Sequence, residues 1–173
     1  PAAQTGSVTV KLNTSIVMLP KEPMQPRFAD DRVGFFQNSL TEFSDDQQTT
    51  DRGAIIQRYR LEPKDPERYR RGQLSEPKNP IIYYIDPATP KKWIPYLKAG
   101  VEDWNTAFEA AGFKNAIIAK EWPNDPNMSL DDARYSVIRY LSSETENAYG
   151  PRIVDPRSGE IMESHICWYH NVM

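Results

Sequence analysis

The two histidines of the chain lie close together, with its single cysteine between them. They form the segment HICWYH, which runs from His165 through Cys167 to His170. Zinc prefers imidazole nitrogen and thiolate sulfur, but it needs three or four ligands. In a strand, His165 and Cys167 would point to one face and His170 to the other, so this segment alone supplies two ligands at most. We therefore assign no metal ligand here. A small metal-binding domain built on these three side chains stays open as an alternative, and it requires stoichiometric zinc in the purified chain.

Motifs that would place a catalytic centre are missing from the sequence. It contains no G-x-S-x-G elbow, no H-E-x-x-H pair and no glycine-rich phosphate loop. Three aspartates in the segment 123–135, Asp125, Asp131 and Asp132, could bind calcium. They lack the alternate spacing and the closing glutamate of an EF-hand loop, so we do not assign them a cation. The residues alone therefore predict no catalytic residue and no complete active site.

The composition limits the class of protein. The 173 residues are 39% hydrophobic and carry a net charge of −3, so no basic field indicates nucleic-acid binding. The longest apolar runs are too short to cross a membrane. One cysteine excludes a disulfide within the chain. The chain begins at Pro1 without a signal peptide and ends at HNVM, so we expect it to be a piece of a longer protein.

The element that organises the second half is a predicted helix in residues 90–112. Its apolar residues recur at spacings of three and four, which places them on one face of a helix. They are Ile94, Leu97, Val101, Trp104, Phe108 and Ala111. We expect the regular helix from about Ile94 to Ala111, with Trp104 buried and Gly112 as its stop.

Strand-like runs flank this helix. The continuous apolar run 81–85 predicts a strand covered on both faces, and 115–122 and 135–141 predict two more. A strand–helix–strand unit should make the first strands parallel. Two extended runs, 151–155 and 160–169, are joined by PRSG, which predicts a hairpin in which Gly159 has positive φ.

The first half predicts a small antiparallel β unit. Residues 7–19 alternate between apolar and polar side chains, which is typical of a half-buried strand, and 32–43 and 54–61 add further strands. The charged, proline-rich stretch 62–80 is the best boundary. We predict an α+β chain with an accessory β region and connector at 1–75, followed by a mixed, twisted sheet backed by one long helix at 76–173.

Several motifs resemble a family of large bacterial zinc metallopeptidases, which are metzincin-like and have an N-terminal accessory region. The resemblance begins near Arg27 and rests on PRFADDRVGFF, on W-N-x-A-F-x-x-A-G-F from Trp104 to Phe113, and on G-P-R-I-V-D-P-R-S-G-E-I from Gly150 to Ile161. It implies that residues 76–173 are the upper, N-terminal subdomain of the peptidase domain. In that subdomain, the segment 151–155 would be the antiparallel edge strand above the catalytic cleft.

The resemblance also implies which part of the parent protein contacts the substrate and which part holds the zinc. An edge strand can pair with an extended peptide, so Arg152, Ile153 and Val154 would face the substrate. The zinc ligands of the family would lie downstream of Met173, so the parent would be a zinc-dependent metalloendopeptidase, whereas this chain would hold no zinc and be inactive alone. A cell-envelope or secreted location is implied in the same way.

An alternative from another class is a non-catalytic module of the cell envelope that binds a protein or a glycan. Tight binding by this chain, together with an inactive parent, would favour it. In either case the lower face of a truncated domain would lack a partner. We therefore expect self-association, or exposed apolar surface around Ile161, Ile166 and Trp168.

Overall fold

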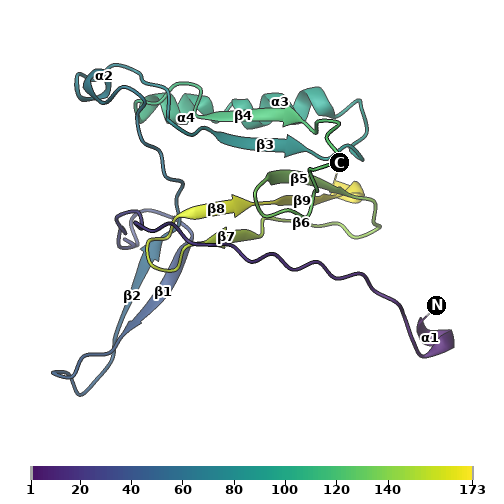
Figure 1. Cartoon of the computed structure of the whole chain (residues 1–173), viewed down its shortest axis with the longest axis horizontal. Helices are drawn as coiled ribbons and strands as arrows, with labels where there is room; N and C mark the ends of the chain where they lie inside the picture. The colour runs from purple at the N-terminus through teal and green to yellow at the C-terminus, as the bar shows by residue number, and fades with distance from the viewer. Residues whose placement is uncertain (1, 173) are drawn as a thin grey trace.

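The chain folds as an α+β protein, as predicted. The computed structural model describes residues 2–172, and Figure 1 shows its arrangement. In chain order the elements are α1 (Ala2–Thr5), β1 (Gln37–Glu42), β2 (Asp51–Ile56), α2 (Pro66–Arg70), β3 (Ile81–Ile85), α3 (Ile94–Glu102), α4 (Asn105–Ala110), β4 (Ile117–Glu121), β5 (Ser136–Leu141), β6 (Ala148–Tyr149), β7 (Arg152–Val154), β8 (Ile161–Ser164), β9 (Ile166–Tyr169) and the 3₁₀ turn η1 (His170–Val172).

The main sheet has five strands in the order β4-β3-β5-β9-β6. Strand β3 is parallel to β4 and β5, and β5 is parallel to β9, whereas β6 runs antiparallel to β9 at the edge. This confirms the parallel strand–helix–strand unit and the antiparallel element at one side. Strands β1 and β2 form a separate antiparallel pair, and so do β7 and β8.

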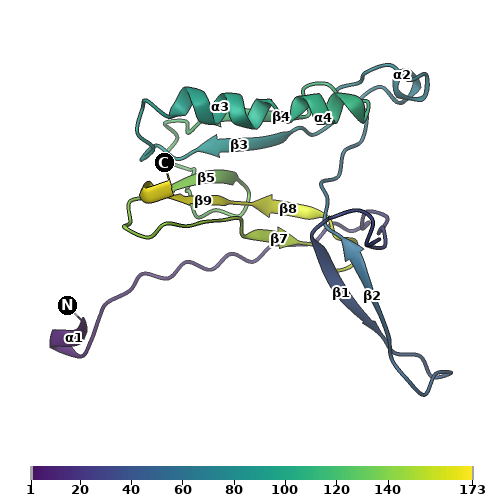
Figure 2. The ribbon, with the colours of Figure 1, turned by 180° about the vertical axis from the view of Figure 1, so that it is seen from behind.

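The helical layer begins at Ile94, as predicted, but it is not one regular helix. Helix α3 ends at Glu102, and α4 starts at Asn105 in the same general direction (Figure 2). The two residues between keep right-handed dihedral angles, but the bond from Trp104 N–H to Val101 C=O spans three residues instead of four. The turn is therefore tighter there, and the side chains that follow it are rotated about the helix axis relative to those of a regular α-helix.

The predicted burial of Trp104 is wrong. Its side chain is 65% exposed at the break between α3 and α4. The apolar stripe nevertheless packs as expected on both sides of it, because Val101 is buried and Leu97 and Phe108 contact a core formed with Ile81 and Ile117. The spacing of apolar residues thus identified the correct helix face, but it could not show that this part of the face has no cover.

Asn105 ties the helical layer to the sheet. Its Oδ1 accepts hydrogen bonds from the N–H groups of Ala116 and Ile117 at 2.9 and 3.2 Å. Its Nδ2 donates to the Ile117 carbonyl at 2.9 Å. Because β4 starts at this point, the side chain fixes the first residue of the strand against the first turn of α4. Gly112 ends the layer with a φ of +91°, as predicted.

The predicted hairpin forms, with interruptions in both arms. The outer arm consists of β6 and β7, and the inner arm of β8 and β9, with His165 between them. Gly159 has a φ of +73° in the connecting turn, which confirms the prediction. A Cβ at Gly159 would come within 2.1 Å of the Ile56 carbonyl oxygen, so the end of β2 packs directly onto this turn.

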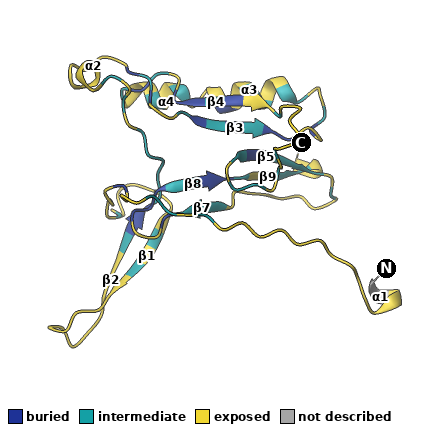
Figure 3. Ribbon diagram, in the orientation of Figure 1, coloured by how far each residue is buried: buried dark blue, intermediate teal, exposed yellow. Residues whose placement is uncertain are grey.

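The predicted half-buried strand at 7–19 is wrong. These residues are extended but belong to no ladder, and nearly all of them are exposed (Figure 3). The alternation is present, but the apolar side chains that it places on one face are exposed to solvent: Ile16 is 97% and Met18 91% exposed. Alternation predicts which side chains share a face, but a strand also needs a neighbour to bond.

Three arginines hold the segment that follows to the rest of the molecule. Arg157, Arg60 and Arg58 donate to the backbone carbonyls of residues 20, 22 and 25 at 2.7, 3.0 and 2.8 Å. Arg60 also forms an ion pair with Glu160 at 2.7 Å. The accessory region therefore contacts the start of β8, although the predicted division at residues 75 and 76 stays a prediction.

Candidate functional site

The outer arm of the hairpin presents a backbone edge along β7. His165 N–H bonds the Pro151 carbonyl at 2.9 Å, and Asp155 N–H bonds the Glu160 carbonyl at 2.9 Å, so these residues point inward. Hydrogen bonding alternates along an antiparallel strand, so the backbone groups of Arg152 and Val154 point away from β8. By the same alternation, the bond from Tyr169 N–H to the Asn147 carbonyl places Ala148 and Gly150 outward.

This edge carries the three residues that were predicted to face a substrate. Arg152, Ile153 and Val154 make up β7 and are half-buried. Within the described chain, no group bonds the outward N–H or C=O of Arg152 or Val154. The Arg152 guanidinium lies over the Phe36 ring, 4.1 Å from its centre. Sequence reasoning missed this contact, because nothing local links the two positions.

A buried polar pair stands behind the edge. The Nδ1 atom of His165 contacts the Glu163 carboxylate, and Nε2 lies 3.2 Å from the Leu130 carbonyl oxygen. The hydrogen bond to Glu163 raises the pKa of His165, against the opposing effect of burial. Since both ring nitrogens face acceptors, the arrangement suits the doubly protonated imidazolium. The His165 side chain thereby connects the loop 123–135 to the hairpin.

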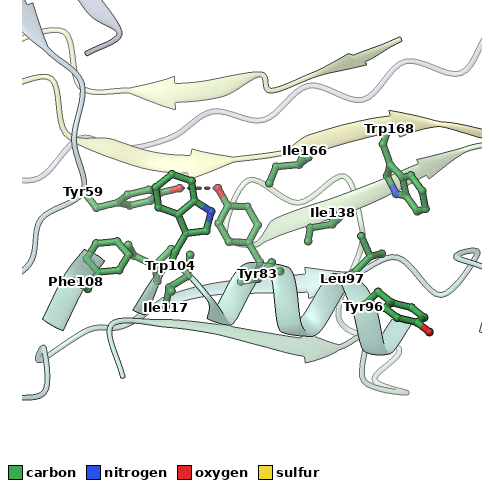
Figure 4. Close-up of a pocket in the computed structure, with 13 residues that line it drawn as sticks. Tyr59, Tyr83, Tyr96, Leu97, Trp104, Phe108, Ile117, Ile138, Ile166 and Trp168 are labelled. Carbon is green, nitrogen blue, oxygen red and sulfur yellow. Dashed lines mark hydrogen bonds between the residues drawn. The ribbon is translucent and has the colours of Figure 1, made fainter. Parts of the chain in front are cut away.

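The opposite face of the sheet has an apolar groove (Figure 4). Helix α3 packs on β4 and β3, which leaves a space of about 570 Å³ between the helical layer and the residues of β5 and β9. Ile138, Ile166 and Trp168 line it from the sheet, and Tyr96 and Trp104 from the helices. Near one end, the hydroxyls of Tyr59 and Tyr83 form a 2.8 Å hydrogen bond, and burial raises the pKa of Tyr59.

The groove bears on the prediction of exposed apolar surface. Ile166 is 38% exposed and Trp168 is half-buried, and both line the groove. Ile161 is half-buried and lines a different cleft, next to Tyr84 and Tyr135. The predicted patch is therefore divided between two sites, and self-association through it stays a prediction.

The histidine and cysteine side chains do not form a metal site. His165 and Cys167 line one cleft on the same face, as predicted, whereas His170 bonds the Tyr140 hydroxyl at 2.6 Å. Across residues 2–172, no three histidine, cysteine, aspartate or glutamate side chains gather so that they could hold a metal ion. The described residues thus do not fit zinc, which the resemblance places elsewhere.

The aspartates of the loop 123–135 also have hydrogen-bond or ion-pair partners within the chain. Asp131 and Asp132 pair with Arg139 and Arg134, at 2.9 and 2.6 Å. Asp125 accepts from the backbone and side chain of Asn127. Their carboxylates therefore shape the loop.

Comparison with known proteins gives one partial match. Residues 1–64 match the profile of a family described as a domain of unknown function, DUF5117. No curated protein and no solved structure matches the chain. Among the described residues, none of the helices is both long enough and apolar enough to cross a membrane.

Proposed function

We propose that the chain is part of a zinc-dependent metalloendopeptidase, and that its β6–β7 edge holds the peptide substrate as an added strand. The observation that carries the proposal is the unpaired backbone of Arg152 and Val154 on an antiparallel edge. An extended peptide satisfies such groups by main-chain hydrogen bonds that do not depend on its sequence. A mixed sheet with a helical layer on one face is also what the resemblance implies for the upper subdomain.

In this proposal the chain's own residues bind and orient the peptide. The N–H groups of Arg152 and Val154 donate to peptide carbonyls, and their C=O groups accept from peptide N–H groups. The bonds from β8 hold β7 from the inner side, so that the outer groups are fixed before the peptide arrives. The Arg152 guanidinium stacks on the Phe36 ring beside this edge. Because the described residues do not fit a zinc site, peptide binding is the only step assigned to them.

A pair of substitutions at one position tests the binding role. Val154→Pro removes an outward N–H without touching a bond to β8, and proline is tolerated at such edge positions. Val154→Ala keeps the N–H and is the matched control. Binding of a fluorescein-labelled peptide of alternating threonine and valine, flanked by lysines, is measured by anisotropy. We expect the proline variant to lose at least about tenfold in affinity, because one or two main-chain hydrogen bonds are lost. Equal affinity in both variants would remove the edge from the proposal.

The catalytic part of the proposal is tested on the longer parent protein. It should digest an unfolded protein substrate, lose this activity with a zinc chelator and regain it with added zinc, whereas the 173-residue chain should not digest the substrate. A parent that binds no zinc and digests nothing would refute the peptidase assignment. If the edge still bound peptide in that case, the non-catalytic binding module would be the better description. A cell-envelope or secreted location is part of the proposal in either form.

A further inference from the structure

The N-terminal extended segment lies next to the edge that is proposed to bind peptide. Asn13 lines the same cleft as Tyr149 and Pro151, which lie in and just after β6. Further along, the carbonyl of Pro20 accepts from Arg157, whose guanidinium also pairs with Asp155 directly after β7. In projection the segment runs in the same direction as β7 (Figure 1), and its residues 15–18 line a cleft with residues 129 and 131–134 of the loop 123–135.

Both ends of this segment are held by the protein. Asn13 Nδ2 and Ser15 Oγ lie 3.2 and 3.5 Å from the Asp131 carbonyl, and Arg157 holds Pro20 at 2.7 Å. Asp131 belongs to the loop that His165 and Arg139 bind through the Leu130 carbonyl. The segment is thus kept near the edge at both ends, while the backbone between these contacts has no ladder partner in the described structure.

The composition of the segment suits a strand. Residues 14–19 read TSIVML, with two β-branched apolar residues at its centre. Ile16 and Met18 are almost fully exposed. An apolar, extended segment without a ladder partner is therefore tethered near a strand edge that also has none. Each supplies the hydrogen-bonding groups that the other lacks.

We infer that residues 14–19 are a built-in competitor for the peptide-binding edge, which they close by pairing with β7 as a parallel strand. The structure described here is the open state, in which residues 15–18 face the loop 123–135. This inference rests on the proposed function, since the edge regulated is the one assigned to peptide. Tethering gives the segment an effective concentration in the millimolar range, so even weak pairing would compete. An incoming peptide must displace it.

Proline substitutions test the competition without changing the fold, because the segment belongs to no helix or ladder in the open state. The variant Ile16→Pro/Val17→Pro removes two consecutive N–H groups, one of which would face β7 in either register. The control Val8→Pro/Thr9→Pro carries the same change outside the tethered stretch. In the 173-residue chain, amide hydrogen exchange at Arg152 and Val154 reports pairing directly, and anisotropy of the labelled peptide reports competition.

We expect the first variant to bind the peptide roughly three- to tenfold more tightly than the unsubstituted chain and to exchange its Arg152 and Val154 amides faster, with the control unchanged. If exchange and affinity are the same in all three proteins, the competitor is refuted. Peptide binding that is still lost in Val154→Pro would then leave the proposed function intact. If none of the proteins binds peptide and Val154→Pro changes nothing, both the proposed function and the competition with peptide are refuted.

Discussion

Replacing Asn105 with alanine tests whether one side chain holds the helical layer against the sheet. The substitution removes three hydrogen bonds, two from the N–H groups of Ala116 and Ile117 and one to the Ile117 carbonyl. At about 1 kcal/mol for each bond, and with part of the cost of unpaired backbone groups offset by water at this half-buried position, we expect a loss of about 2–4 kcal/mol. That is a large share of the stability of an ordinary domain.

Urea denaturation followed by circular dichroism measures this loss. Thr106→Ala is the matched control, because Thr106 is exposed in the same turn and none of its side-chain atoms bonds β4 in the described structure. Asn105→Asp keeps an acceptor for the two N–H groups but places a carboxylate oxygen against the Ile117 carbonyl, so an intermediate loss is expected. If Asn105→Ala lowers the free energy of unfolding no more than Thr106→Ala does, the side chain does not anchor the layer.

Three further predictions concern packing, backbone conformation and charge. About a third of the Trp104 side chain is buried, so Trp104→Ala should cost only about 1–2 kcal/mol in urea denaturation; a loss of 4 kcal/mol would mean that the residue is buried in solution. Gly159→Ala should destabilise the chain by more than about 2 kcal/mol, seen as a lower melting temperature, because its φ is positive and its Cβ would overlap the Ile56 carbonyl. Glu163 raises the pKa of His165, so an NMR titration should find the pKa of His165 above 6.5. The stability that the His165–Glu163 pair contributes should be complete below pH 6.5 and be lost as the pH rises through the folded-state pKa of His165. A measured pKa at or below 6.5 would contradict the charged form of His165.

The elements that were predicted correctly are those whose signals are local. A continuous apolar run identified β3, and the helical spacing that begins at Ile94 identified α3. Turn chemistry identified the hairpin, because Gly159 supplies a conformation that most residues avoid. These signals act over a few residues, so no knowledge of distant contacts was needed.

The elements that were missed depend on distant partners. Residues 7–19 have the alternation of a strand, but the chain places no neighbour beside them to complete a ladder. The exposure of Trp104 follows from the open groove beyond α3, which the helix sequence does not encode. For the candidate site, the position of Arg152, Ile153 and Val154 was predicted through a resemblance, whereas the stack on Phe36 needed the folded chain.

Two different kinds of interaction hold the strands of this fold in place. The side with β3 and β4 is covered by helices and stabilised by apolar packing. Polar contacts are prominent farther across the fold: Arg139 of β5 lies 3.4 Å from the buried Asp86 after β3, and His165 contacts Glu163 of β8. Apolar packing is nondirectional, whereas charged hydrogen bonds fix geometry. In the proposed function, a strand that presents N–H and C=O groups to a peptide needs a fixed position more than a large core, and the contact between His165 and Glu163 would help to fix β8, the strand that pairs with β7.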